Sequence, residues 1–583
     1  MTALAESHFR PHSHNRAVAP IAANLAAAVV VVAVTIVVTV TAFMAVASQP
    51  KSLSTFRGTL TRHILAMSRR LRLIRRTRES ARSLEPEHQR YVLFPCHVIS
   101  FEQTQCCRAH NRPNNALIHN LDDDSLLTIF SFCRPVVWEK EGIPAPRFLE
   151  GGEWTRERWW YKLVHVCQRW RYLILGSPSH LGLSLVCAHT TPVADMLKSS
   201  PHLSHLPLII DHLDEKRDVT AESKEGILLA LRHRDRVRRI RLRMSIPNLQ
   251  KLLMAIDDEF PLLEHLYIMP MVRNNTSIIL PGTFQAPHLR HLILESFALP
   301  IGSPVLTTAV GLVTLSLNNI PLSSYFHPND LIHVVSLMPQ LETLGVHFSR
   351  PPTLDIERLP LHMPIMTHVT LPNLRWFGFM GASAYLEAVL PRITTPLLEK
   401  LQIAFFHQLT PPVLHLSQFI SSTESLRFNS INLTFFKEYI TLRVYPREGA
   451  DMFAYALWLK IYSDQLDRQV ASVARILNAL KTALSTVEYL TLKHDTGSHE
   501  EAHRTQWREL LRSLGNLETL RVPDSLVGEL SRCLGPDDTE PPTELLPELK
   551  VLEYTATNDA SDAFASFIDT RKNAGHPVAL VRR

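Results

Sequence analysis

The sequence predicts an α/β protein in which a short helical segment precedes a long array of strand and helix units. The 583 residues exceed what one hydrophobic core usually covers. An apolar triplet recurs from about residue 230 onward, and helical patterns precede several of its copies. With 45% hydrophobic and 20% charged residues, the composition is that of a globular chain and excludes a disordered one.

The triplet has the form L-x-x-L-x-[L/I/V], and its last two positions point to the same side of a strand. Its clearest copies are Leu263/Leu266/Ile268, Leu289/Leu292/Leu294, Leu312/Leu315/Leu317, Leu341/Leu344/Val346, Leu374/Phe377/Phe379, Leu398/Leu401/Ile403, Val487/Leu490/Leu492, Leu517/Leu520/Val522 and Leu549/Leu552/Tyr554. Further copies are expected at Val237/Ile240/Leu242 and, weakly, around Leu426/Phe428. The long interval from Phe428 to Val487 indicates one obscured unit.

Four triplets are preceded by apolar residues at i, i+3, i+4 and i+7, the spacing of one helix face. These sets are Leu249/Leu252/Leu253/Ile256, Leu331/Val334/Val335/Met338, Val473/Ile476/Leu477/Leu480 and Trp507/Leu510/Leu511/Leu514. Repetition of helix and strand predicts parallel strands on one face and helices on the other. The array resembles an irregular leucine-rich-repeat solenoid; a general α/β domain is the alternative.

Within each expected strand, the residues between the triplet positions face away from the helices. They include His265, Tyr267, His291 and Trp376. Because aromatic side chains are frequent in protein recognition sites, we expect these four residues on a concave face that binds a protein substrate. The sequence does not identify that substrate.

A separate helical segment lies before the array. Acidic residues at 122–124 are suited to cap a helix that starts near Asp123 or Asp124. Leu126, Ile129 and Phe130 then fall on one face of that helix. A second helix is expected from about Glu157 to Leu175. Its apolar face consists of Trp160, Leu163, Val164, Cys167, Trp170 and Ile174.

These residues resemble the F-box, whose opening reads Leu-Pro-Asp-Glu-x-Leu-x-x-Ile-Phe and whose later helix reads Val-Cys-x-x-Trp. The resemblance implies a three-helix module that docks on the Skp-type adaptor of a cullin-RING ubiquitin ligase. The implied adaptor-binding residues are Leu121, Asp122, Leu126, Ile129, Phe130, Val166, Cys167 and Trp170. Asp122 replaces the family's proline, and the long insert at 133–159 is similar to F-box-like proteins of mushroom-forming fungi. A helical cap on the array is the alternative interpretation.

The N-terminal region contains a candidate membrane anchor. Residues 17–50 include no charged side chain, and the stretch 21–47 is long enough to cross a bilayer as a helix. The basic flank after residue 50 would place the body in the cytosol. A signal peptide is one alternative. Another is a mistaken gene model for residues 1–90, which would leave a cytoplasmic or nuclear protein.

Charge and motifs exclude several functions. The formal net charge is +6, but residues 51–90 hold most of the excess, and residues 91–583 are slightly acidic, so no nucleic acid partner is expected. Seven scattered cysteines are typical of a reducing compartment. No common catalytic signature is present, and we expect no enzyme activity, no cofactor and no metal site. The Cys and His residues between 96 and 110 match no zinc-site spacing.

The expected organisation has six parts. They are a tail at 1–16, a candidate transmembrane helix at 17–50, a basic linker at 51–112, the F-box-like segment at 113–176, a connecting segment at 177–230 and the solenoid at 231–583. The predicted function is substrate recognition within an SCF-type ubiquitin ligase. The alternative is a membrane-anchored leucine-rich-repeat scaffold without a ligase role.

Overall fold

A computed structural model describes residues 121–134, 159–188, 193–198, 203, 205–213, 219–272, 278–349, 367–406, 413–495, 502–535, 544–555 and 563–582. The chain divides into two compact units, Met1–Asn114 and Asn115–Arg583, and every described residue belongs to the second. The expected membrane span at 17–50 and the basic linker at 51–112 lie outside the described residues. No helix in the described ranges combines the length and apolarity needed to cross a bilayer.

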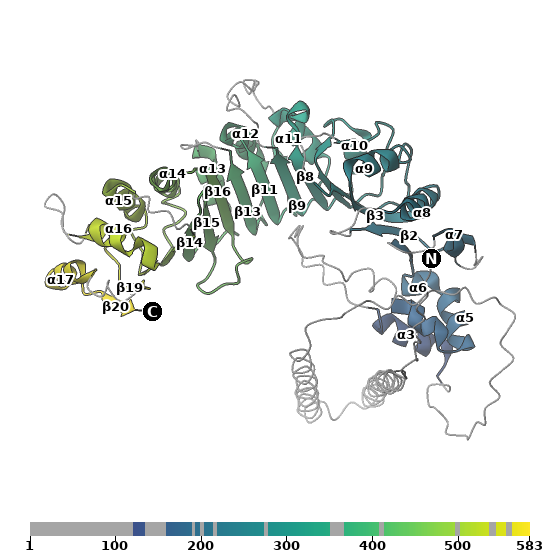
Figure 1. Cartoon of the computed structure of the whole chain (residues 1–583), viewed down its shortest axis with the longest axis horizontal. Coiled ribbons are helices and arrows are strands. Elements are labelled where there is room, and N and C mark those ends of the chain that lie inside the picture. Colours follow the sequence, from purple (N-terminus) through teal and green to yellow (C-terminus); the bar gives the residue numbers. More distant parts are fainter. Residues whose placement is uncertain are drawn as a thin grey trace, which may run out of the picture. The chain divides into compact units, whose positions relative to one another are not determined.

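The second unit is organised around one sheet of sixteen described strands (Figure 1). Across the sheet these are β1 Leu185–Ala188, β2 Leu208–His212, β3 Val237–Met244, β4 His265–Pro270, β6 His291–Glu295, β8 Thr314–Ile320, β9 Thr343–Phe348, β11 Trp376–Gly381, β13 Lys400–Phe405, β16 Leu457–Tyr462, β15 Tyr439–Tyr445, β14 Ser430–Phe435, β17 Tyr489–His494, β18 Thr519–Val522, β19 Val551–Tyr554 and β20 Ala579–Arg582. Only β15 is antiparallel to its neighbours among these strands. The prediction of parallel strands is confirmed.

Two short parallel pairs lie outside this sheet among the described residues. They are β5 Ile278–Ile279 with β7 Phe297–Ala298, and β10 Val369–Thr370 with β12 Ile393–Thr394. Each pair joins segments of adjacent repeat units, because β5 and β7 flank β6, and β10 and β12 flank β11. The repeats are therefore connected at their loops as well as through the main sheet.

Helices connect most consecutive strands, and α9 to α16 lie along one side of the sheet (Figure 1). The helices are α3 Asp123–Phe132, η2 Trp159–His165, α5 Gln168–Gly176, α6 Pro178–Leu181, α7 Val193–Lys198, α8 Ala221–Leu231, α9 Ile246–Leu253, α10 Pro304–Thr307, η4 Leu322–Ser324, α11 Pro328–Ser336, α12 Ser383–Val389, η6 Leu390–Arg392, α13 Leu414–Ser422, α14 Leu466–Ala479, α15 Arg504–Arg512, α16 Asp524–Leu534 and α17 Ala565–Asn573. The four predicted helical patterns correspond to α9, α11, α14 and α15.

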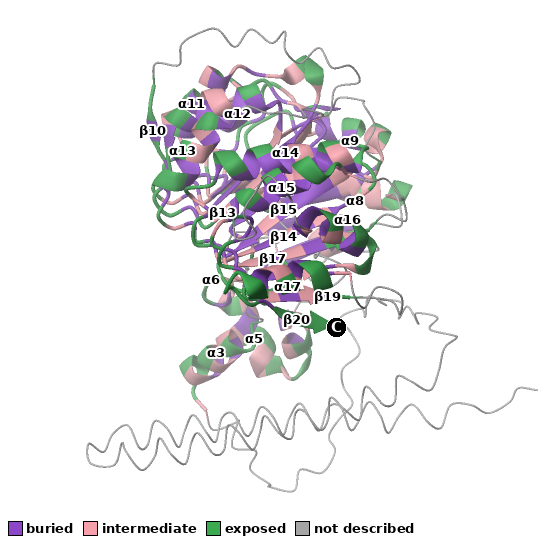
Figure 2. Cartoon of the chain, turned by 90° about the vertical axis from the view of Figure 1, so that its left-hand side faces the viewer, coloured by how far each residue is buried: buried purple, intermediate pink, exposed green. Residues whose placement is uncertain are grey.

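The core lies between the sheet and this helix layer, and Figure 2 shows the strands as largely buried. Leu344 and Val346 of β9 have no exposed surface, and neither does Val335 of α11. Burial of each such side chain contributes roughly 1.5–3 kcal/mol. One continuous apolar cluster extends from Leu126 to Val578, so each repeat depends on its neighbours for burial.

The sheet begins earlier than the sequence indicated. β1 and β2 belong to it although they lie in the expected connecting segment at 177–230. Their inward residues are Leu185 and Cys187 in β1, and Leu208 and Ile210 in β2. The first leucine of the triplet is missing from both strands, because Gly182 and His205 occupy that position. The triplet pattern therefore did not predict them.

The interval from Phe428 to Val487 does not contain one obscured unit of the ordinary kind. β14 pairs with β17, β15 returns antiparallel, and β16 pairs with β13. After β13 the chain therefore leaves two positions of the sheet vacant and forms β14 at the third. It then returns toward β13, and β15 and β16 occupy the two vacant positions. The triplet of this region is Phe428/Ile431/Leu433 rather than one centred on Leu426, since Ile431 and Leu433 are the buried residues of β14.

The second expected helix of the F-box-like segment is interrupted. A 3₁₀ helix, η2, ends at His165, and α5 begins at Gln168. Cys167 has extended backbone angles, φ −156° and ψ 170°. The Arg171 Nε group donates to the Val164 carbonyl at 3.0 Å, which satisfies a carbonyl at the end of η2.

Candidate interaction surfaces

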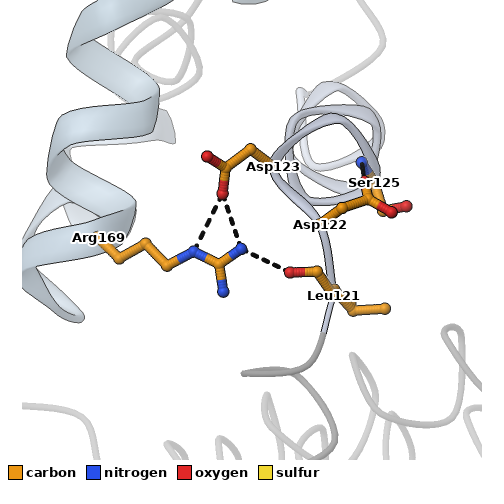
Figure 3. Close-up of polar contacts among 5 residues, drawn as sticks. All are labelled: Leu121, Asp122, Asp123, Ser125 and Arg169. Atoms are coloured by element: carbon orange, nitrogen blue, oxygen red, sulfur yellow. Dashed lines mark hydrogen bonds and ion pairs between the residues drawn. The ribbon is translucent and has the colours of Figure 1, made fainter.

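Asp122 caps the first helix of the F-box-like segment. Its Oδ1 accepts a hydrogen bond from the Ser125 amide at 2.7 Å (Figure 3). This hydrogen bond lowers the pKa of the Asp122 carboxyl. Its φ of −67° is also the angle that a proline ring imposes, so the backbone at this position keeps a conformation compatible with the family's proline.

Arg169 joins the start of α3 to α5. Its Nε and Nη2 donate to Asp123 Oδ1 at 3.1 and 2.7 Å, and Nη2 also donates to the Leu121 carbonyl at 2.5 Å (Figure 3). Both side chains of this ion pair are more than one third exposed, so it adds little stability. Its contribution is geometric, because it holds the loop at Leu121 against the second helix.

The predicted adaptor-binding residues divide between interior and surface. Leu126 and Phe130 are 0% and 1% exposed, and the Phe130 ring meets the Trp170 ring edge-on at 4.8 Å. Leu126 and Phe130 therefore form the core of the segment, and the expectation that they lie in its contact surface is wrong. They point inward because α6 packs against α3 and supplies the interior that sequence periodicity does not locate.

The surface of the segment retains other predicted residues. Leu121, Ile129, Cys167 and Trp170 are half-buried, Asp122 is exposed, and Val166 is 58% exposed. Two large exposed side chains were missed, Phe132 at 76% and Tyr172 at 68%. The sequence could have indicated them, because each is an aromatic residue that lies outside the apolar face of its helix and is therefore expected at the surface.

The second surface is the side of the main sheet that faces away from the helices, called the open face below. Register places His265, His291 and Trp376 in one row across the strands, linked through Thr314 and Thr343. The same register places Tyr267 beside Arg241 and Ile293 in the next row. All four predicted face residues therefore lie on the open face.

His265 and His291 stack with ring centroids 4.3 Å apart and an angle of 8° between their planes. His291 Nδ1 lies 3.1 Å from Thr314 Oγ1. Burial lowers the pKa of His265 to about 2, with further lowering by the cations of Arg239 and by His291. The stacked histidine pair therefore forms an aromatic part of the open face beside the arginines of β3, and His265 is its neutral member.

Trp376 is 3% exposed, so the expectation of an exposed tryptophan is wrong. Its ring lies across Gly378 and Gly345, positions where a Cβ atom would overlap or crowd its neighbours. Its side chain also hydrogen-bonds with Tyr455, whose hydroxyl donates to Gln402 Oε1 at 3.0 Å. Tyr455 belongs to the connection between β15 and β16, which thus covers Trp376.

The connection at 446–456 also reaches the other side of the β14–β16 region. Its Glu448 pairs with Arg521 of β18, and Arg521 Nε donates to Glu553 of β19 at 2.7 Å. The side-chain hydrogen bonds of these two carboxylates raise the pKa of Arg521. The connection is thereby held at both ends, through Glu448 and Tyr455, and Met452 and Phe453 between those ends are 55% and 40% exposed.

The described residues contain no group of three His, Cys, Asp or Glu side chains placed to hold a metal ion. Their cysteines, Cys133, Cys167, Cys187 and Cys533, form no disulfide. The Cys and His residues between 96 and 110 lie outside the described ranges.

The depressed pKa of His265 predicts a specific loss of stability in acid. In the unfolded chain, His265 has the usual histidine pKa of about 6.5 and takes up a proton as the pH falls below that value. In the folded chain it takes up the proton only near its lowered pKa of about 2. Between pH 7 and pH 5 this linkage lowers the free energy of unfolding by about 2 kcal/mol. In urea unfolding at both pH values, His265→Gln should lose less stability than the wild type. The exposed His576→Gln is the control, and an equal loss in all three proteins would contradict the assignment.

The Trp376 arrangement predicts that Gly378→Ala destabilises the protein by about 1–3 kcal/mol, because the new methyl group overlaps the Trp376 ring. Gly311→Ala is the matched control, since nothing lies within 4 Å of a Cβ there. In the Trp376→Leu background, Gly378→Ala should cost much less. A cost that is unchanged in that background, measured by urea unfolding, would disprove the overlap.

Comparison with known proteins adds little to this picture. No family model matches the chain, and no curated protein matches it. One solved structure with similarity is the crystal structure of a TLR13–ssRNA13 complex, at 15% identity over 69% of this chain and 49% of that one, with a TM-score of 0.27. The chain spans about half the length of that structure. The fold of this protein is therefore an α/β array of leucine-rich units defined by its own strands and helices.

Proposed function

We propose that this protein is a substrate-recognition subunit of an SCF-type ubiquitin ligase. The F-box-like segment would dock on a Skp-type adaptor, itself bound to the cullin core, and the open face would bind a protein substrate. The chain would act by proximity, since it needs to hold the substrate near the ligase and supplies no catalytic group. The resemblance of residues 121–130 and 166–170 to the F-box motivates the proposal.

The observation that carries it is the exposure of Phe132, Val166 and Tyr172 on a helical segment whose own core is complete. Leu126, Phe130 and Ile174 already fill the interior of that segment, so these three side chains have no further role in its packing. Large apolar groups on such a small element are typical of a surface that a partner covers.

A ligase subunit also needs a firm link between its two binding surfaces. α6 packs against both α3 and α5, and its Leu181 is 1% exposed in the same apolar cluster as Leu185 of β1. Gly182, with φ +58°, ends α6 in the left-handed conformation that directs the chain into β1. Such continuity would keep a bound substrate at a defined distance from the adaptor.

The proposal predicts that the full-length protein binds a purified Skp-type adaptor and that Val166→Asp combined with Tyr172→Asp weakens binding at least about tenfold. Charged groups at these positions would be buried without partners at the interface. The control is Leu322→Asp with Leu414→Asp, which alters two exposed apolar residues of the array. Titration calorimetry measures both. Undiminished binding by the first variant would refute this interface, and no binding by the wild type would refute the ligase role.

The second candidate function is a membrane-anchored leucine-rich-repeat scaffold without ligase activity. The uncharged stretch at 17–50 motivates it. Under this alternative the adaptor would not bind, and the full-length protein would stay with membranes during alkaline carbonate extraction. Release into the soluble fraction would rule out the spanning helix, and with it the membrane localisation.

A further inference from the structure

We propose that the open face over β13, β16, β15, β14 and β17 binds an extended, acidic segment of the protein substrate. The inference rests on the proposed function in one respect, namely that the sheet is the substrate-binding surface. It adds the chemical class of the substrate and the strands that recognise it.

These five strands carry positive charge on the open face and no carboxylate. Their open-face residues are Lys400, Gln402 and Ala404; Trp458, Lys460 and Tyr462; Tyr439, Thr441, Arg443 and Tyr445; Ser430, Asn432 and Thr434; and Tyr489, Thr491 and Lys493. The buried alternates of the same strands, such as Leu459 and Leu433, face the helix layer. The cationic side chains Arg443, Lys460 and Lys493 are called the basic set below.

The positive charge ends at β18. Arg521 of that strand is engaged by Glu553 on one side and by Glu448 on the other, so its charge is already balanced. The connections beside these strands do contain carboxylates, namely Glu438 between β14 and β15, and Glu448 and Asp451 between β15 and β16. Glu448 is the one paired with Arg521. The face between β13 and β17 therefore attracts anions.

Register gives the spacing that a ligand would match. Lys460 is aligned with Thr441, Thr441 with Thr434, and Thr434 with Lys493, so the two lysines lie in one row three strands apart. Three strand spacings correspond to about 14 Å. In an extended peptide, side chains four residues apart point the same way and lie about 13 Å apart. Acidic residues at i and i+4 of a segment that crosses the strands would reach both lysines.

The aromatic residues favour a peptide over a nucleic acid. The Lys460 ammonium lies 3.7 Å from the centre of the Tyr439 ring and 4.4 Å from that of Tyr462. These rings hold the cation in place, and the faces that they turn toward it are not free for stacking on a base. Trp376 is buried and equally unsuited to stacking. The surface thus offers a cation held in place between two rings, which suits a carboxylate.

The test uses the full-length protein and a labelled peptide of about twelve residues with Glu at every fourth position, which matches the row of lysines. Its counterpart has Gln in place of Glu, and a single-stranded RNA of similar length is the third ligand. Fluorescence anisotropy should show that the Glu peptide binds at least about tenfold more tightly than the Gln peptide. The advantage should shrink as salt rises, because exposed charges are screened.

The variant that removes the interaction is Arg443→Gln with Lys460→Gln and Lys493→Gln. The matched control makes the same charge change on the helix layer, with Lys251→Gln, Arg475→Gln and Lys481→Gln, all exposed. The first variant should lose at least about tenfold in affinity for the Glu peptide and the control less than about twofold. Urea unfolding of both verifies that they fold.

Three outcomes would overturn the inference: equal binding of the Glu and Gln peptides, equal losses in the two variants, or binding of the RNA without binding of the Glu peptide. Adaptor binding, measured on the same preparations, separates this inference from the proposed function. Adaptor binding without peptide binding would refute only the acidic substrate. Peptide binding without adaptor binding would refute only the ligase role.

Discussion

The burial of at least two inward residues from every strand of the main sheet except β20 is the constraint on which the rest of the structure depends. Leu344 and Val346 of β9 are completely buried, as are Leu401 and Ile403 of β13. Because side chains alternate along a strand, fixing one side in the core assigns every other residue to the open face. The open face is thus a direct consequence of the core, and a one-residue shift in register would destroy both.

The open face differs along its length. At β4 and β6 it presents the stacked pair His265 and His291 beside the arginines of β3. At β11 it is closed, because the hydrogen-bonded pair Trp376 and Tyr455 occupies it. From β13 to β17 it carries the basic set. One irregularity produces this division: the antiparallel strand β15 creates the β15–β16 connection, whose Tyr455 lies beside Trp376 and whose Glu448 balances the charge of Arg521.

The F-box-like segment combines a complete core with an apolar exterior. Asp122 caps α3 while keeping a proline-like φ, and Arg169 fixes the entry loop to α5 through Asp123 and the Leu121 carbonyl. These contacts hold the start of α3 and its entry loop in place. They leave Phe132, Val166 and Tyr172 at the surface, where their apolar area is available to a partner.

Local spacing in the sequence determined much of this protein. The triplets located most strands, the i, i+3, i+4 patterns located α9, α11, α14 and α15, and the acidic run located the start of α3 at Asp123. These features depend on residues close together in the chain, whose periodicity records which side is buried.

Only the tertiary structure decided which strand is adjacent to which around β14–β16, and that Trp376, Leu126 and Phe130 are interior. The contact between Arg169 and Asp123 joins residues 46 positions apart, so it too was decided only by the tertiary structure. Such features depend on which distant segments of the chain pack against a given residue. The spacing of apolar residues within one segment carries no information about that packing.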